Sequence, residues 1–222
     1  MKPLYITILL SGLLIALWLI GRATGILQFF RVVSKAGLPG IKPGRIYIRS
    51  SLKKPSRFDL ICFRALLPET GPVIYTQRLC GLPGDALEIK AGVLYVNGMN
   101  ADKDLNLINI YKIEQEDSDR IQYDPRQVYT IPPYNDTFYA ALEDKYVENN
   151  QLPCERYVLP PGLRDGIIFQ VHKRNWNLDN FGPVRVPADR FFVLGDNRGN
   201  ATDSRHLGFI AQKDLIGTML WK

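Results

Sequence analysis

Cysteine and histidine are scarce in this sequence. Its 222 residues include three cysteines, at positions 62, 80 and 154, and two histidines. Three scattered cysteines neither build a disulfide framework nor supply a zinc site, and we expect no metal and no cofactor. Cys62 lies in an apolar run and is expected to be a small buried hydrophobic side chain. Whether Cys80 and Cys154 pair outside the cytoplasm depends on a geometry that the sequence does not give.

The sequence also lacks a stretch in which Lys and Arg gather between aromatic residues. The formal net charge of +6 is modest for 222 residues, so no nucleic-acid partner is expected. A basic face beside anionic lipid accounts for this charge, and so does a surface with no charged partner. Hydrophobic residues make up 46% of the chain and charged residues 23%, which is ordinary for a folded protein.

A long hydrophobic run is present near the N-terminus. Residues 4–20 (LYITILLSGLLIALWLI) are seventeen residues without a charge, at the short end of what crosses a hydrocarbon core about 30 Å thick. A cleaved signal peptide is the alternative, but residues 20–23 (IGRA) make a poor cleavage site. We therefore expect an uncleaved membrane anchor within residues 1–30.

The charges beside this run say little about orientation. Lys2 precedes the run, whereas Arg22, Arg31 and Lys35 follow it, which leans slightly towards a cytoplasmic body. Long domains cross membranes largely regardless of charge, so the count alone does not decide the side.

The rest of the chain mainly predicts β-strands. Residues 45–49 alternate between polar and apolar side chains, as a half-buried strand does. Further short β-rich runs cover residues 59–63, 73–79, 87–90, 93–96, 190–194 and 215–221. Turn signals separate these runs, and the dipeptide Asn97-Gly98 is typical of a tight hairpin.

The middle section, residues 99–182, differs in character. It is polar and rich in Asn and Asp, and we interpret it as an insertion or second lobe on the β body. Residues 137–149 (TFYAALEDKYVEN) are predicted to be its short helix, with Thr137 as the N-cap.

Three stretches occur in the order found in type I signal peptidases, and the chain resembles that family. They are residues 39–44 (PGIKPG), residues 78–98 beginning RLCGLPGD, and residues 192–208 containing GDNR and DSR. Each stretch alone is an ordinary turn or polar loop. Their joint order behind a hydrophobic run is hard to obtain by chance.

The resemblance implies a mainly β, antiparallel fold with an N-terminal transmembrane helix. It implies an anchor in residues 1–30, a β core from residues 31–98 and 183–222, and an inserted lobe in residues 99–182. It also implies that the body lies on the extracytoplasmic side of the cell membrane, which overrides the charge count. Signal peptides of secreted preproteins, or other extended peptides, are the partners that it implies.

Family members cleave with a serine nucleophile and a lysine base. A serine hydroxyl is a weak nucleophile unless a positioned base takes its proton, and a lysine is that base only when burial lowers its pKa. Alignment on residues 39–44 places Ala36 at the serine position, and ungapped alignment on residues 78–85 places Gln77 at the lysine position. Ala201 stands where the family commonly has a serine near its lysine.

These replacements predict a non-catalytic protein. Alanine has no nucleophile, and the glutamine amide does not titrate near neutrality. An active peptidase using Ser34 as substitute nucleophile is the first alternative, with Lys35, Lys42 or His206 as its base; Ser34 is otherwise expected to support an oxyanion hole. A non-enzymatic partner subunit of an active signal peptidase is the second alternative, with the middle section as its contact surface.

A peptide groove does not require the nucleophile, because an extended peptide binds by adding a strand to a sheet edge. The residues predicted to line this groove are Leu38, Ile41, Tyr75 and Thr76. The residues predicted to support the site are Asp196, Arg198, Asp203 and Arg205, of which Asp203 and Arg205 are expected to pair. His206, directly after the DSR motif, is expected to have a structural or surface role instead of a catalytic one.

Overall fold

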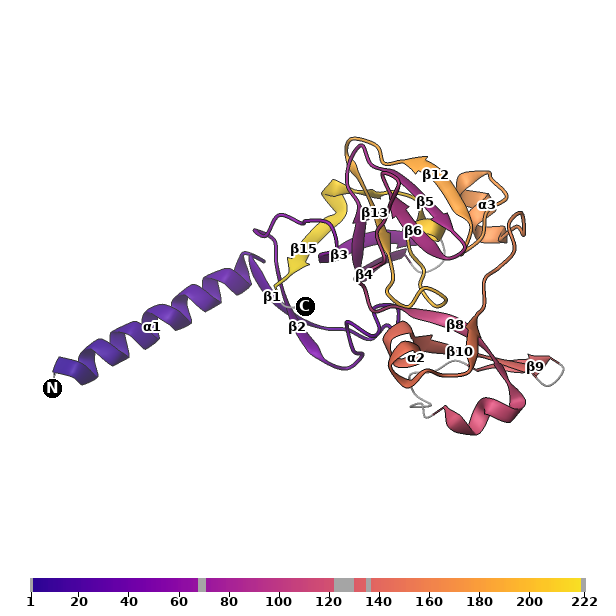
Figure 1. The fold of residues 1–222 in the computed structure, drawn as a ribbon. Helices are drawn as coiled ribbons and strands as arrows, with labels where there is room; N and C mark the ends of the chain where they lie inside the picture. Colours follow the sequence, from indigo (N-terminus) through magenta and orange to yellow (C-terminus); the bar gives the residue numbers. More distant parts are fainter. Residues whose placement is uncertain (1, 68–70, 122–129, 135–136, 221–222) are drawn as a thin grey trace.

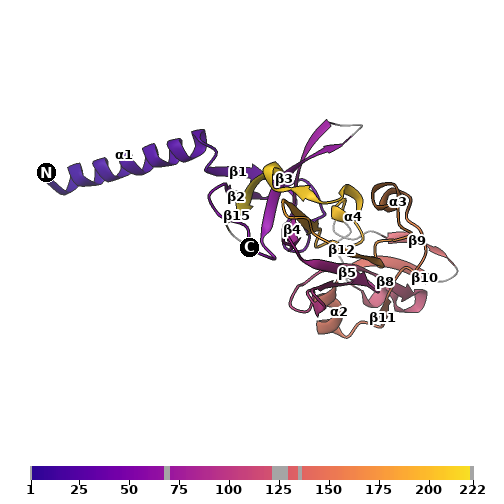
Figure 2. The ribbon, with the colours of Figure 1, turned by 90° about the horizontal axis from the view of Figure 1, so that it is seen from above.

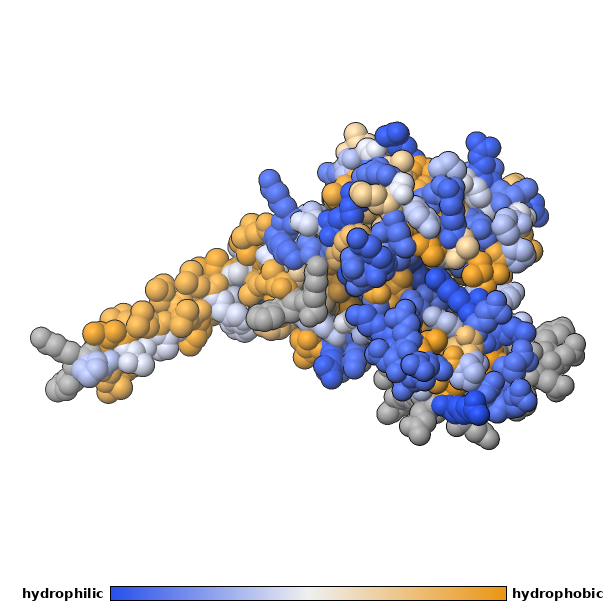
Figure 3. Space-filling model, viewed as in Figure 1, coloured by the Kyte–Doolittle hydropathy of each residue, from blue (hydrophilic) through white to orange (hydrophobic). Residues whose placement is uncertain are grey.

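An apolar helix stands apart from a β-rich body in the computed structural model (Figure 1). The structure describes residues 2–67, 71–121, 130–134 and 137–220. Helix α1 spans Lys2–Ala23, and an 18-residue window of its segment Pro3–Ala23 has a mean hydropathy of 2.3 and contains no buried residue. By length and composition it is able to cross a membrane, a test that a signal sequence also passes. Its surface is mostly hydrophobic with a paler band along one side, whereas the body mixes hydrophilic and hydrophobic areas (Figure 3).

The largest sheet has seven strands in the order β1-β2-β15-β3-β4-β13-β14, and all neighbours are antiparallel. Strands β3 and β4 form a long hairpin that projects from the body (Figure 2). The strands of this sheet are β1 (Leu27–Arg31), β2 (Ile46–Ser50), β3 (Leu60–Leu67), β4 (Gly71–Gly81), β13 (Arg190–Leu194), β14 (Ile210–Ala211) and β15 (Leu215–Met219).

A second antiparallel sheet has the order β12-β5-β6-β7. Its strands are β5 (Ala86–Lys90), β6 (Val93–Val96), β7 (Met99–Asn100) and β12 (Phe181–Arg185). The predicted hairpin at Asn97-Gly98 is confirmed: both residues have positive φ, 52° and 80°, as a type I′ turn requires. The main core lies between this sheet and the first one, where Leu87 and Leu94 pack with Phe192.

The third sheet is the lobe sheet, with the antiparallel order β11-β8-β10-β9. Its strands are β8 (Ile108–Glu114), β9 (Thr130–Tyr134), β10 (Thr137–Glu143) and β11 (Cys154–Arg156). The 3₁₀ helix η1 (Gln115–Arg120) and helix α2 (Asp144–Asn150) lie beside it. The section 99–182 therefore contains a sheet of its own. The two ends of this section, β7 and the start of β12, do not belong to the lobe sheet but pair with strands of the second sheet.

The predicted helix over residues 137–149 is wrong in its first half. Thr137 begins strand β10, which pairs with β8 through Glu143, and the helix starts only at Asp144. Both faces of β10 are covered, because Ala140 and Leu142 pack in the lobe core while Ala141 packs towards Ile108. A strand buried on both faces shows no alternation, so its apolar run was mistaken for a helix.

Three short elements complete the fold. They are α3 (Gly166–His172), α4 (Ser204–Leu207) and the 3₁₀ helix η2 (Gln212–Asp214). Helices α3 and α4 lie beside each other at the edge of the core (Figure 2). Neither was predicted, and α3 belongs to the section interpreted as polar.

Candidate functional site

Ala36 lies in the segment between β1 and β2, and its backbone is held on both sides. Its carbonyl oxygen accepts a hydrogen bond of 3.0 Å from the amide of Asn197. Its own amide donates to the Ser34 hydroxyl oxygen at 3.1 Å. The side chain is a buried methyl group, which offers neither a nucleophile nor a hydrogen bond.

Gln77 lies on β4, opposite Ile61 on β3, and is only 1% exposed. Its Nε2 donates a hydrogen bond of 2.7 Å to the carbonyl oxygen of Thr202. Its Oε1 is buried without a partner among the described residues. A neutral amide in this place joins two chain segments but takes up no proton near neutrality.

Gly195 brings the region of Ala36 against that of Ala201. A Cβ placed on Gly195 would overlap the Ala201 methyl group and lie 2.8 Å from the Ala36 carbonyl oxygen. Glycine is therefore required there on steric grounds. The three positions at which the family's polar groups are expected, 36, 77 and 201, thus border one region: Ala36 contacts residues 195–197, and Gln77 is bonded to the residue after Ala201.

Three buried ion pairs fix the loops around this region. Arg78 Nε donates to Asp196 at 2.6 Å, and Arg78 Nη1 donates to the carbonyl of Phe58 at 2.7 Å. Burial opposes the charged form of Arg78, but the hydrogen bond and charge of Asp196 outweigh it and raise the pKa of Arg78. Arg198 pairs with Asp102 at 2.7 Å, so the Arg78 and Arg198 pairs tie the GDNR loop to β4 and to the loop after β7.

Asp203 and Arg205 form the third pair, at 2.7 Å between Oδ2 and Nη2. Arg205 is almost fully buried and also donates to the carbonyls of Arg198 and Leu178. Five donors on a rigid guanidinium make this bracing possible. The predicted supporting residues are thus all engaged in buried bonds around the GDNR and DSR motifs.

Two pockets lie beside Ala36 and share Ser34, Ala36 and Tyr75 in their linings; together they are called the groove here, and each is one compartment of it. The small compartment has a volume of about 180 Å³ and lies between the β1–β2 segment and β4. Its lining residues are Phe30, Arg31, Val32, Val33, Ser34, Ala36, Gly37, Val73, Ile74, Tyr75 and Thr76. The large compartment has a volume of about 720 Å³ and reaches α3 and α4. Its lining residues are Ser34, Ala36, Leu67, Tyr75, Ile167, Gln170, Val171, Leu178, Gly199, Asn200, Ala201, Thr202, His206 and Leu207.

Two of the four residues predicted for the groove are placed elsewhere. Tyr75 lines both compartments and Thr76 lines the small one. Leu38 is 2% exposed and packs against Ile108 at the base of the lobe, while Ile41 is fully buried beside Leu60. The expectation that Leu38 and Ile41 face the groove is therefore corrected: the segment turns inward after Ala36, and these side chains fill the core.

Both histidines lie next to the DSR motif. Carbonyl oxygens of Ser204 and Arg205 lie 3.3 and 3.1 Å from His172 Nε2, so this nitrogen carries the proton that it donates. His206 lines the large compartment, with Nδ1 3.9 Å from Asp203 Oδ1. Burial lowers the pKa of both His172 and His206, against the opposing charge of Asp203 at His206. Both rings are therefore neutral at neutral pH.

The Ser34 hydroxyl is exposed at the junction of the two compartments. The hydrogen bond recorded at its oxygen is accepted from the Ala36 amide. A nucleophile needs a base that accepts its proton. Of the bases considered, His206 lies beside Asp203 on the large-compartment wall, and Lys42 is exposed on the loop leading to β2.

Neither metal ligands nor disulfides are found within the described residues. No group of three His, Cys, Asp or Glu side chains comes together there. The three cysteines are free thiols. Cys80 is buried in the main core, where burial raises its pKa to about 12, and Cys154 packs against the lobe core. The pairing left open by the sequence is therefore not formed in this structure.

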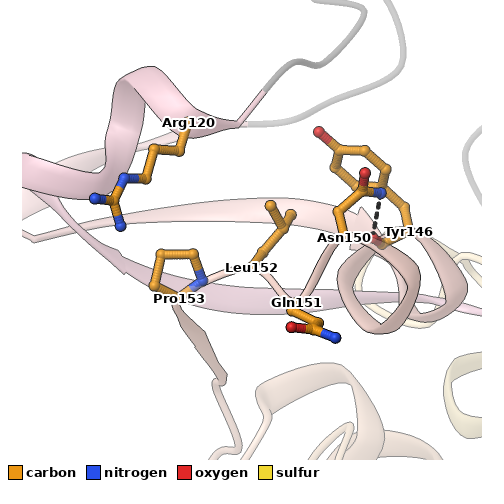
Figure 4. Close-up of a pocket in the computed structure, with 6 residues that line it drawn as sticks. All are labelled: Arg120, Tyr146, Asn150, Gln151, Leu152 and Pro153. Atoms are coloured by element: carbon orange, nitrogen blue, oxygen red, sulfur yellow. Dashed lines mark hydrogen bonds between the residues drawn. The ribbon is translucent and has the colours of Figure 1, made fainter.

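A separate hollow of about 680 Å³ lies on the lobe (Figure 4). It is bordered by Arg120, by Asn150 at the end of α2, and by the α2–β11 connection, which includes Leu152. None of the residues predicted for the site lines it. The predicted peptide-binding site therefore corresponds to the groove beside Ala36 and not to this hollow.

Comparison with known proteins identifies the family. The sequence model described as signal peptidase, peptidase S26, matches residues 5–222. The chain is 26% identical over 175 residues to signal peptidase I S of Bacillus subtilis, covering 78% of this chain and 64% of that protein. It is 31% identical over 175 residues to signal peptidase I of Rickettsia typhi, covering 78% of this chain and 52% of that protein.

The chain thus spans between about half and two thirds of the length of these relatives. A crystal structure of a signal peptidase I from Enterococcus faecalis is 25% identical and covers 76% of this chain and 98% of that one, with a TM-score of 0.38. Such a score is too low to support an argument from shape, and the assignment rests on the sequence match. With that match over almost its whole length, the chain belongs to the signal peptidase family.

Proposed function

We propose that this chain is a non-catalytic signal peptidase homologue that binds extended peptides in the groove beside Ala36. The observation that carries the proposal is the pair of side chains at the dyad positions. Ala36 presents a methyl group, and Gln77 is buried with its amide bonded to the Thr202 carbonyl. Neither side chain can attack a carbonyl or accept its proton.

Without both the nucleophile and the base, catalysis by the family's mechanism is abolished and not merely slowed. A triad enzyme without its nucleophile keeps a residual rate of only roughly 10³–10⁴ over water, from binding and its oxyanion hole. The scaffold that would bind peptide is nonetheless intact, because the buried pairs of Arg78, Arg198 and Arg205 hold the loops around the groove. Loops that are held in place around the groove, together with the missing nucleophile and base, support peptide binding without cleavage.

The setting proposed is a membrane of the secretion pathway. Helix α1 is long and apolar enough to anchor the chain, and family members act on signal peptides. We place the body on the extracytoplasmic side, with signal peptides or similar extended segments as ligands. Main-chain pairing along a strand edge supplies affinity without the nucleophile.

A second candidate, an active peptidase that uses Ser34, is favoured by one observation. The Ser34 hydroxyl lies at the junction of both compartments, where a bound peptide would pass. Against it, no base among the described residues accepts a recorded hydrogen bond from this hydroxyl, whose recorded bond is accepted from the Ala36 amide.

A serine-reactive fluorophosphonate probe, followed by mass mapping of the labelled peptide, separates the two candidates. The non-catalytic proposal predicts no labelling at Ser34 above that of a heat-denatured sample. Stoichiometric labelling at Ser34, lost on unfolding, would establish the active alternative and overturn the proposal.

A further inference from the structure

Helix α3 presents two apolar side chains to solvent on one face. It begins at the Asp165 cap, whose carboxylate accepts hydrogen bonds of 2.9 Å from the amides of Ile167 and Ile168. Ile168 is fully buried in the main core, which leaves Ile167 57% and Val171 43% exposed. Their spacing of four residues places them one above the other on the same helix face.

The helix is fixed in position by its other contacts. His172 at its end donates to the Arg205 carbonyl, and the His172 ring meets Phe181 edge-on at 4.8 Å between centroids. Asp165 also donates its amide to the carbonyl of Trp176 at 2.9 Å. The exposed pair Ile167 and Val171 is therefore a preformed surface on a rigid element, not the tip of a loop.

This surface forms one wall of the large compartment. The same lining includes Leu67 and Tyr75 of the β3–β4 hairpin and Leu207 of α4. None of the described lining residues is Asp, Glu, Lys or Arg. His206 is neutral there because burial lowers its pKa. A charged ligand group would lose its hydration in this compartment without gaining an opposite charge.

The two compartments meet at Ala36. Ser34, Ala36 and Tyr75 line both of them, so an extended peptide crossing Ala36 lies beside both compartments. The volumes differ about fourfold, at about 180 Å³ and 720 Å³. The large compartment therefore has more than enough room for a bulky side chain.

We infer that α3 forms a second recognition subsite, in which Ile167 and Val171 receive a bulky, uncharged apolar side chain of the bound peptide. The inference rests on the proposed function, since it names the class of peptide that the groove selects. Removing a Leu- or Phe-sized side chain from water against such a wall strengthens binding roughly ten- to hundredfold.

The test uses the full chain in detergent micelles and a fluorescent peptide series. The parent peptide has alanine at its centre and serine, threonine and glycine elsewhere. Each flanking position in turn is replaced by Leu and, separately, by Asp. Fluorescence anisotropy gives Kd for each peptide on the wild type, on Ile167→Ser with Val171→Ser, and on Leu163→Ser. Leu163 is a matched control, because it is an apolar residue just before α3 that is 49% exposed but does not line the large compartment.

The inference predicts one flanking position at which Leu binds roughly tenfold or more tightly than Asp. The double variant loses that preference, and Leu163→Ser keeps it. Because both α3 side chains are exposed, their replacement leaves no core cavity, and a melting curve confirms folding. A positional preference that survives in the double variant overturns the inference and leaves the proposed function standing. No binding above that to empty micelles overturns both.

Photo-crosslinking gives a readout that needs no variant. A peptide carrying benzoylphenylalanine at the preferred position is irradiated on the wild-type chain, and the adduct is mapped by mass spectrometry. Adducts within Gly166–His172 or on Leu67 support the inference. Adducts confined to the lobe or to α1 overturn it.

Discussion

The Gln77 side-chain amide donates a hydrogen bond of 2.7 Å to the carbonyl oxygen of Thr202. The bond joins β4 to the loop between β13 and α4, at the position that motif alignment matches to the family's lysine. A neutral donor thus connects the two segments there, while its Oε1 remains without a partner. The Gln77 amide thus has a structural role here, and under the proposed function it takes no part in catalysis.

This arrangement predicts opposite responses to two similar substitutions at position 77. Gln77→Glu should destabilise the fold by about 3 kcal/mol at neutral pH, because a buried carboxylate faces a carbonyl oxygen and has no proton to donate. Lowering the pH should restore much of that loss, since the protonated acid donates again. Gln77→Met should cost less than about 1.5 kcal/mol, because it removes the bond together with the unpaired Oε1. Urea unfolding of the full chain in detergent measures all three proteins, and equal losses in both variants would refute the bond's role.

The Arg78–Asp196 pair should contribute far more to folding than an exposed ion pair. Removing Arg78 leaves a buried carboxylate, and Arg78→Ala should cost about 3–5 kcal/mol in unfolding free energy. The exposed pair between Lys90 and Glu88 is the matched control, and Lys90→Ala should cost less than about 1 kcal/mol. Similar losses in both variants would show that the GDNR loop does not depend on this pair.

Stability should rise with pH on the acidic side of neutrality. Burial lowers the pKa of His172 and His206 below the ordinary value of 6.5 in the folded state. The unfolded chain therefore binds more protons in the window between the lowered pKa values and 6.5, and unfolding becomes harder as pH rises through it. His206→Gln should flatten part of this slope, the remainder belonging to His172. An unchanged slope would mean that His206 titrates alike in both states.

The thiols should differ in accessibility. Cys62 and Cys80 are fully buried, and burial raises the pKa of both, whereas Cys154 is only partly buried. Iodoacetamide should therefore modify Cys154 first in the native protein, and all three thiols only after unfolding. Peptide mapping without reduction checks this order. A Cys80–Cys154 disulfide in the map would contradict the structure.

Restoring the dyad should restore chemistry only when both residues return. Ala36→Ser alone lacks a base, and Gln77→Lys alone lacks a nucleophile, so each should stay at the residual level. The double variant should cleave a preprotein measurably, and adding Ala201→Ser should raise the rate further by supplying a hydroxyl near the lysine. Activity in either single variant equal to that of the double would contradict this dependence.

Much of the fold could be predicted because its strands carry local signals. The alternation at residues 45–49 and the Asn97-Gly98 turn correspond to β2 and to the β6–β7 hairpin. Strand β10 could not be recognised in the same way, since its burial on both faces depends on partners distant in sequence. Local pattern fails where tertiary contacts set the environment.

The site shows the same division. Motif alignment matches Ala36 and Gln77 to the family's serine and lysine positions from the sequence alone. In the structure, both residues form hydrogen bonds to the segment 195–202. The sequence predicts Leu38 and Ile41 in the groove, but packing against Ile108 and Leu60 turns their side chains inward. The α3 wall was missed altogether. Its one local signal is Asp165 before an apolar run, the pattern of a capped helix.

Incubation of the purified wild-type chain in detergent with a preprotein tests the absence of catalysis most directly. The product is followed by gel and mass spectrometry beside the Ser34→Ala variant and the Ala36→Ser, Gln77→Lys double variant. We predict that neither the wild type nor Ser34→Ala releases the mature protein, while the preprotein still binds to both. Cleavage by the wild type that Ser34→Ala abolishes would contradict the account and make Ser34 the nucleophile.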